Sequence, residues 1–302
     1  MSRSGKSRAR IILSLALCLS FGLSACAVAA NSTVSSLQIS VVAAENFYGD
    51  LVQQLGGSHV AVTSILSDPN IDPHAYESNV QNSLAVSKAL LVIENGDGYD
   101  AWMDKLLSAS PSAERVVLVA ADIADHKLAN NPHVWYGLDN IQTIARSISA
   151  SLEKIDPADK NAYDASLSVF LQSLAPVQQK IDDLKAKYNA VPVALTETIF
   201  LYQTGPIGLN VLTPFEFEKA VAEGIDPPAD TVVTANDQIL KGQVKVLIYN
   251  EQTITPITTN LQNEAKQANI PIVPVTETMP PGKHYQDWML DQLNALQQAL
   301  GG

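Results

Sequence analysis

The sequence predicts an α/β protein of two lobes, each with a mainly parallel sheet covered by helices, with the lobes joined by one long helix. Its 302 residues exceed the usual size of about 100 to 200 residues for one domain. A composition of 46% hydrophobic and 17% charged residues is typical of a globular core and argues against disorder. Short β-branched runs alternate with amphipathic stretches, which favours parallel sheets with covering helices.

The predicted elements divide the body of the chain into three parts. Between the lobes, residues 156–189 carry apolar side chains at helical spacing and no strand signal, which predicts one long helix. Asp156 is the expected cap of this helix, Pro157 its first residue, and Pro176 should kink or split it. The lobes are therefore expected at residues 37–155 and 190–302. Their strands are expected at residues 38–43, 60–65, 89–93 and 115–119, and at 191–195, 231–234, 244–249 and 270–275.

Residues 1–25 predict a signal peptide. Four basic residues and no acid precede an apolar run at 11–23, which is shorter than the about 20 residues of a membrane span. Residues 23–26, Leu-Ser-Ala-Cys, resemble the lipobox of bacterial lipoproteins, in which the cysteine becomes the lipidated first residue. Cys26 is therefore expected to anchor an exported protein to the outer face of the cytoplasmic membrane, with residues 26–36 as a flexible tether. An ordinary cut after Ala25 or Ala30 is the alternative.

Charge and cysteine content exclude several classes of function. The net charge is −12, the sequence pI is about 4.7, and no basic stripe is present, so nucleic acid would be repelled. Removing residues 1–25 would lower the charge to −16, since their charged side chains are all basic. The two cysteines, Cys18 and Cys26, leave none for a disulfide framework or a cysteine zinc site in the body. A monomer is expected.

Two of the five histidines share a context that suits metal binding. Asp72-Pro73-His74 and Asn131-Pro132-His133 each follow a predicted strand and loop, which in an open parallel sheet is the end where ligands bind. Proline fixes its own φ and keeps the preceding residue extended, so each imidazole is presented from a stiff backbone. Asp72, Glu77 and Asn131 are candidates to orient these imidazoles. His74 and His133 are therefore candidate ligands.

The second lobe offers two carboxylates in comparable places. Glu197 follows the strand at 191–195, Glu277 follows the strand at 270–275, and each is flanked by threonines. Two neutral imidazoles and two carboxylates would balance the charge of a divalent cation in a partly buried cleft. His284, in a nearby turn, is the alternative to Glu277, and His126 could lie along the route to the site.

These motifs resemble those of a known family. Residues 72–77 and 131–135 are similar to the paired Pro-His motifs of the metal-binding lipoproteins that serve manganese and zinc ABC importers. The resemblance implies two lobes that hold a divalent metal ion as cargo for a membrane permease. It also implies two histidine ligands from the first lobe, with a histidine or glutamate and an acidic residue from the second. Glu197 matches the glutamate form, whereas Glu277 stands where the family usually has aspartate.

The ligand set favours Mn²⁺ over Zn²⁺, with Fe²⁺ behind. Equal numbers of carboxylate and imidazole ligands form a harder site than three histidines, although zinc has the higher intrinsic affinity. The His-rich loop that zinc-specific members often carry is absent from the sequence. The rival hypotheses are an exported metal-dependent hydrolase that uses the same ligands and a metal-binding surface adhesin. Since the sequence contains no His-Glu-x-x-His motif, serine nucleophile elbow or phosphate-binding glycine loop, a binding protein that is not an enzyme is expected.

Overall fold

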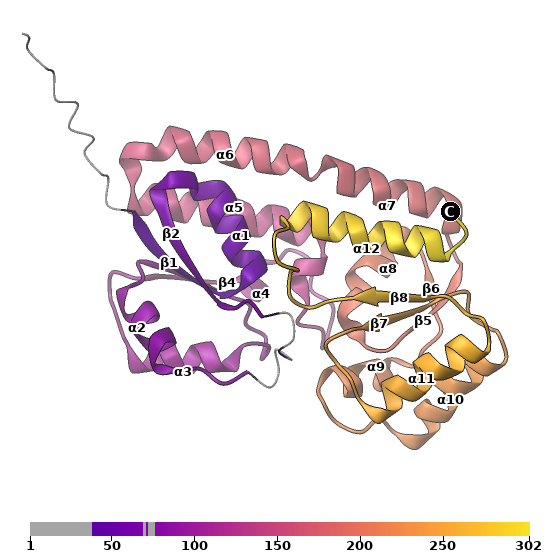
Figure 1. The fold of residues 1–302 in the computed structure, drawn as a ribbon. Coiled ribbons are helices and arrows are strands. Elements are labelled where there is room, and N and C mark those ends of the chain that lie inside the picture. Colours follow the sequence, from indigo (N-terminus) through magenta and orange to yellow (C-terminus); the bar gives the residue numbers. More distant parts are fainter. Residues whose placement is uncertain (1–37, 69–70, 72–75) are drawn as a thin grey trace, which may run out of the picture. The chain divides into compact units, whose positions relative to one another are not determined.

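Two four-stranded parallel sheets organise the chain in the computed structural model, which describes residues 38–68, 71 and 76–302 (Figure 1). The strand order is β2-β1-β3-β4 in the first sheet and β6-β5-β7-β8 in the second. The strands are β1 (Ile39–Glu45), β2 (Val60–Leu66), β3 (Leu91–Glu94), β4 (Val116–Val119), β5 (Pro192–Leu195), β6 (Asn210–Val211), β7 (Leu247–Asn250) and β8 (Ile272–Val275). In each sheet the chain begins at an inner strand, β1 or β5, adds one strand on one side and then two strands on the other. Open α/β sheets bind ligands where the strand order reverses in this way.

The first sheet is buried between two layers of helices. On one side, α1 (Asn46–Gly56) and α5 (Leu138–Ile155) pack on the sheet; on the other, α2 (Val80–Lys88) and α3 (Ala101–Ala109) enclose a smaller apolar cluster. Strands β1 and β3 are almost wholly buried, as expected for β-branched runs covered on both faces. All four strands predicted for this lobe are confirmed to within a few residues.

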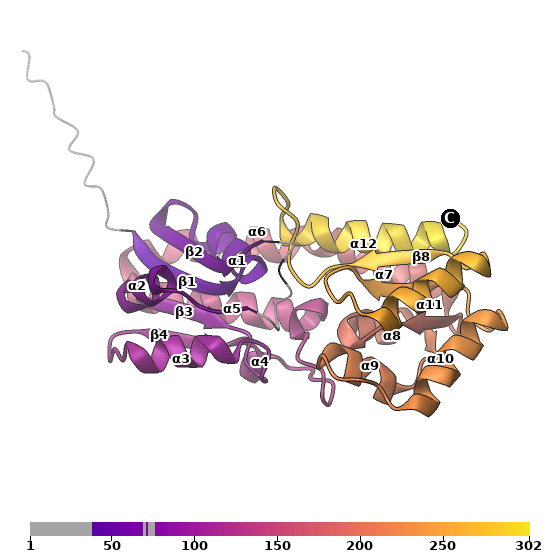
Figure 2. The same ribbon diagram turned by 60° about the horizontal axis from the view of Figure 1, so that its bottom comes forward.

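The second sheet is covered in the same way (Figure 2). Helices α9 (Phe215–Ala222), α10 (Ala229–Leu240) and α11 (Pro256–Gln267) form its outer layer. Helices α8 (Leu201–Ile207) and α12 (Tyr285–Ala299) lie on the inner side, where α12 packs against the linking segment. Helix α11 begins as its sequence indicates: Thr255 accepts a hydrogen bond from the Thr258 amide at 3.1 Å, and Pro256 occupies the first turn.

One predicted strand is wrong and one strand was not predicted. Residues 231–234, Thr-Val-Val-Thr, lie inside helix α10. The side chains of Val232, Ala235 and Ile239 pack into the outer cluster of the second lobe, and their spacing of three and four is helical. The fourth strand of the sheet is instead β6, a two-residue pairing beside β5 that carries no periodic signal of its own.

The linking segment is two helices rather than one. Helices α6 (Lys160–Ser173) and α7 (Ala175–Tyr188) meet at Leu174, so Pro176 lies in the first turn of α7, where a missing N–H costs little. The segment begins with a short 3₁₀ turn at Pro157–Asp159. Asp156 does not cap this turn with its side chain; it accepts a hydrogen bond from the Tyr163 hydroxyl at 3.0 Å instead. The boundaries 37–155, 156–189 and 190–302 stay a prediction.

A single hydrophobic cluster runs under the linking helices through both lobes. It contains Val41 of β1, Ile144 of α5, Ile181 of α7 and Val273 of β8, and all four are nearly inaccessible to solvent. Residues 37–302 accordingly form one compact unit. Within the part of the chain that the structure describes, no helix combines the length and apolar character needed to cross a bilayer.

Candidate metal centre

Three of the four predicted ligands converge in the structure. His133, Glu197 and Glu277 each place one nitrogen or oxygen atom within 4.8 Å of the others, and all three side chains are at most 1% exposed. His74 lies outside the described residues, so its place relative to this cluster stays a prediction. One imidazole and two carboxylates at this separation form a donor set suited to a divalent cation.

Asn131 fixes the orientation of the His133 ring. Its side-chain nitrogen donates to the carbonyl oxygen of Thr198 at 2.8 Å, which leaves its oxygen Oδ1 as the acceptor. That oxygen receives the backbone N–H of His133 at 3.1 Å and lies 2.8 Å from the ring nitrogen Nδ1. The proton is therefore placed on Nδ1, and the lone pair of Nε2 points away from Asn131. The predicted orienting role of Asn131 is consistent with this geometry.

Glu277 is held by groups from both lobes. Tyr99, from the loop after β3, donates its hydroxyl to Oε2 of Glu277 at 2.8 Å. Burial and the nearby charge of Glu277 raise the pKa of Tyr99, so this hydroxyl keeps its proton and remains a donor. On helix α1, Asn46 contacts both backbone groups of Met279, accepting from its N–H at 3.0 Å and donating to its carbonyl at 2.6 Å. The turn that carries Glu277 is thus fastened to the first lobe.

Two further residues of the second lobe were missed by sequence reasoning. Asn250, the last residue of β7, donates to Oε1 of Glu197 at 2.7 Å and to Oε1 of Glu277 at 2.5 Å. Glu218, on α9, is 1% exposed; burial raises its pKa, and the charge of Glu197 raises it further. Asn250 directly follows the strand predicted at 244–249, but no feature of the sequence pairs that strand with the two strands that precede the glutamates. Glu218 carries no signal of its place in the sequence either.

Aromatic side chains enclose the cluster on the first-lobe side. The ring of Trp135 lies 5.1 Å from that of His133 and stacks on Phe47 at 4.6 Å between centroids. Tyr136 places its hydroxyl 2.6 Å from the carbonyl oxygen of Thr276, the residue before Glu277. Trp135 and Tyr136 therefore pack around the candidate ligands.

The remaining histidines lie elsewhere. His284 pairs with Asp50 of α1, its Nδ1 lying 2.7 Å from Oδ1 of Asp50, and its side chain is 64% exposed. The structure therefore brings Glu277, and not His284, to the cluster. His59 lies with Asp156 and Asp159 in a second group of possible metal-binding side chains, but its Nδ1 contacts Oδ2 of Asp159 at 2.8 Å, and both side chains are partly exposed.

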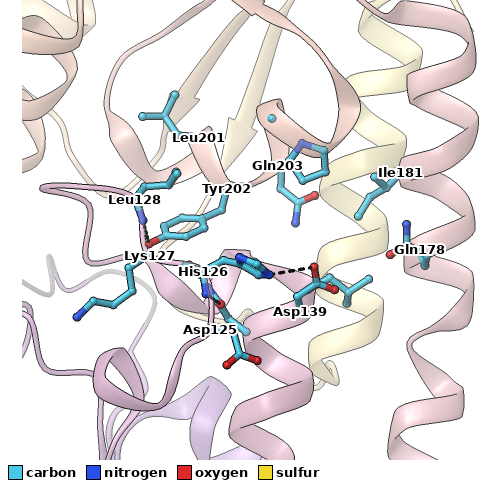
Figure 3. A pocket seen from close by; sticks show the side chains of 15 residues that line it. Asp125, His126, Lys127, Leu128, Asp139, Gln178, Ile181, Leu201, Tyr202 and Gln203 are labelled. Carbon is cyan, nitrogen blue, oxygen red and sulfur yellow. Dashed lines mark hydrogen bonds and ion pairs between the residues drawn. The ribbon is translucent and has the colours of Figure 1, made fainter.

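One cavity of the described structure is separate from the cluster. It has a volume of about 540 Å³ and lies between the loop at 125–128, α7 and α8 (Figure 3). His126 lines this cavity, 4.0 Å from Asp139, whereas His133, Glu197 and Glu277 do not line it. A smaller hollow of about 370 Å³ is lined by Tyr99, Asn131 and His133, so it borders the cluster at His133. Because the candidate ligand His133 lines the smaller hollow, this hollow and not the larger cavity is relevant to metal binding.

Comparison with known proteins identifies the family. The ZnuA family, described as zinc-uptake complex component A, periplasmic, matches residues 41–299. The chain belongs to this family. Among relatives of this ZnuA-family chain, the metal ABC transporter substrate-binding lipoprotein ScbA of Streptococcus cristatus is 26% identical over 320 residues, covering 98% of this chain and 99% of ScbA. The manganese ABC transporter substrate-binding lipoprotein PsaA of Streptococcus pneumoniae is 24% identical, and the match covers 86% of each chain.

Solved structures share the fold of this ZnuA-family chain. The periplasmic zinc binding protein TroA from Treponema pallidum matches with a TM-score of 0.76 at 15% identity, covering 88% of this chain and 100% of TroA. The binding protein FpvC from Pseudomonas aeruginosa, solved in complex with Mn²⁺, matches with a TM-score of 0.72 at 20% identity, covering 87% and 98%. The predicted family and the two-lobed α/β fold are confirmed.

Proposed function

We propose that the chain is the extracytoplasmic substrate-binding component of an ABC importer, which captures a divalent metal ion between its lobes and passes it to a membrane permease. The convergence of His133, Glu197 and Glu277, buried and within 4.8 Å of one another, carries this proposal. Its relatives support it, since they are named as manganese or metal ABC transporter substrate-binding lipoproteins. His74 is proposed as the fourth ligand, contributed by the first lobe.

The proposed cargo is Mn²⁺ or Zn²⁺, with Fe²⁺ less favoured. Two imidazoles and two carboxylates give two nitrogen and two oxygen donors, which suit manganese better than a nitrogen-rich set does. Zinc binds such a site more tightly by intrinsic affinity, so the supply of metal outside the cell would contribute to the choice. The carboxylates, with two negative charges, would balance the charge of the ion in a buried position where an unpaired charge is costly.

The proposal includes attachment to the membrane. Residues 1–25 would be removed and Cys26 lipidated, which would place the binding lobes at the outer face of the cytoplasmic membrane beside the permease. Fractionation of cells that express the wild type or Cys26→Ser tests this part. The wild type is expected in the membrane fraction, and Cys26→Ser in the soluble exported fraction or with its signal peptide retained. Equal membrane attachment of both would contradict lipidation at Cys26.

Metal analysis tests the binding function. Purified residues 26–302 are expected to hold close to one Mn²⁺ or Zn²⁺ ion per chain in titration calorimetry. His74→Ala, His133→Ala and Glu277→Ala are each expected to weaken binding sharply. His59→Ala is the matched control, because His59 is a histidine outside the proposed ligand set and lies with Asp156 and Asp159 instead. This change should leave binding at the proposed site unchanged.

Two outcomes would overturn the proposal. Tight binding of one ion per chain by all three ligand variants would show that the site is elsewhere. Metal-dependent hydrolysis that turns over repeatedly would favour the rival enzyme. Titrations at a fixed pH are required, because protons compete with the metal for every ligand.

A further inference from the structure

Asn250 occupies a central place in the second sheet. Strand β7 pairs with β5 on one side and with β8 on the other, in parallel. Glu197 comes two residues after the end of β5, and Glu277 two residues after the end of β8. Because parallel strands end at the same edge of a sheet, the last residue of β7 lies between the two glutamates. Asn250 is that residue, and it is 1% exposed.

A single nitrogen of Asn250 contacts both carboxylates. Its Nδ2 lies 2.7 Å from Oε1 of Glu197 and 2.5 Å from Oε1 of Glu277, and the hydroxyl of Thr253 is 2.9 Å away. An amide nitrogen carries two hydrogens, which Asn250 shares among three acceptors: the two carboxylates, at the two shorter distances, and the Thr253 hydroxyl. Hydrogen bonds to charged acceptors are about twice as strong as neutral ones, so this one side chain restrains both carboxylates, together with the Tyr99 hydroxyl that Glu277 accepts at Oε2.

The orientation of the Asn250 amide is fixed by the backbone. Its Oδ1 accepts the N–H of Gln252 at 2.9 Å, so the amide cannot turn its oxygen towards the carboxylates without losing that bond. Gln252 in turn accepts the N–H groups of Glu277 and Thr278 at 2.7 and 3.0 Å. The loop after β7 therefore holds the side chain of Glu277 through Asn250 and its backbone through Gln252.

A neutral donor at this position has a specific chemical consequence. A lysine would neutralise one carboxylate and compete with the metal, whereas an amide attracts both carboxylates and leaves their full charge for the ion. With Oε1 of each glutamate bound to the amide, binding of the ion through the other oxygen, Oε2, is favoured. Oε2 of Glu277 also accepts the Tyr99 hydroxyl, and its second lone pair is the one directed to the ion in this arrangement. Single-oxygen binding suits four-coordinate zinc, while two-oxygen binding raises the coordination number towards that of larger oxygen-binding cations.

We infer that Asn250 is a positioning residue of the metal site, which restrains Glu197 and Glu277 to bind the ion through one oxygen each and so shifts the site towards small, four-coordinate ions. This inference rests on the proposed function. It concerns a residue that does not touch the ion, so its signature is a change in the preference between metals and in the coordination number.

Competition titrations with Asn250→Ala test the inference. The Zn²⁺ affinity is expected to fall by about 10 to 100-fold, the range typical for loss of a group that orients metal ligands, and the Mn²⁺ affinity by clearly less. X-ray absorption of the Zn²⁺-bound variant should show a higher coordination number than the wild type. Asn250→Ser, which keeps one donor, should give an intermediate shift and serves as the test variant if Asn250→Ala does not fold.

Asn260→Ala is the matched control, because Asn260 is an exposed asparagine of the same lobe and should leave both affinities unchanged. Equal loss of Zn²⁺ and Mn²⁺ affinity in the folded Asn250 variants, or affinities within about twofold of the wild type, would overturn the inference. Failure of the wild type to bind either metal would instead overturn the proposed function, so the two failures are distinguishable.

Discussion

Replacement of Asn131 by alanine tests how much the orientation of His133 matters, because it removes none of the candidate ligands. The change removes the acceptor for the His133 ring proton and backbone N–H, and the donor to the Thr198 carbonyl. Each buried polar group left without a partner costs about 1 to 3 kcal/mol, and water can replace part of the loss. We therefore expect the metal-free protein to lose about 2 to 4 kcal/mol of unfolding free energy.

The same change should weaken metal binding. Without its acceptor, His133 can exchange tautomers and rotate, so the Mn²⁺ and Zn²⁺ affinities are expected to fall by about 10 to 100-fold. Urea unfolding with a chelator present measures the stability, and titration against a fluorescent chelator measures the affinity. Asn131→Asp keeps the acceptor and should bind metal better than Asn131→Ala. Asn161→Ala, at an exposed asparagine of α6, should change stability by less than about 0.5 kcal/mol. Binding by Asn131→Ala within twofold of the wild type would refute the argument.

Further predictions concern stability. Burial, with the charge of Asp100, raises the pKa of Glu45, so the folded state keeps a proton that the unfolded state loses above about pH 4.3. The wild type therefore loses stability as the pH rises above that value, and Glu45→Gln does not. In urea unfolding between pH 5 and 8, Glu45→Gln should gain stability relative to the wild type. Asp50 raises the pKa of His284, so the pair stabilises the folded state fully below about pH 6.5 and less as the pH rises through the higher pKa of the folded state. The stability that His284→Gln loses relative to the wild type should therefore shrink from pH 6 to 9 in the same assay. Ile148→Ala, in buried α5, should cost about 2 to 5 kcal/mol at the urea midpoint, and a loss below 1 kcal/mol would contradict its core position. Pro176→Ala should change stability by less than about 1 kcal/mol, because the residue lies in a first helical turn.

The local sequence pattern predicted strands correctly where the burial of the side chains and their intrinsic strand propensity agree. Strands β1 and β3 are β-branched and buried on both faces, so composition alone identifies them. Residues 231–234 have the same β-branched composition but belong to a helix, because Val232, Ala235 and Ile239 pack on one face. Intrinsic strand preference is weak, and packing against the second sheet overrides it.

The candidate site was predictable only in part. His133, Glu197 and Glu277 are chemically distinctive and follow strands, so their residue types and positions suffice to select them. Asn250 is neutral, and its role arises from the pairing of β7 with both β5 and β8, which no single stretch of sequence reveals. Tyr99 reaches Glu277 across 178 residues of chain, a contact that depends on the packing of one lobe against the other.

The hydrophobic cluster shared by the two lobes has a thermodynamic consequence. Since one apolar core contains side chains of β1, α7 and β8, neither half can unfold without exposing apolar surface of the other. The chain from residue 37 onwards should therefore melt in a single cooperative transition. A ligand held at the centre would then protect the whole of it: free metal at 100 times the dissociation constant would add about 2.7 kcal/mol to the stability of both halves together.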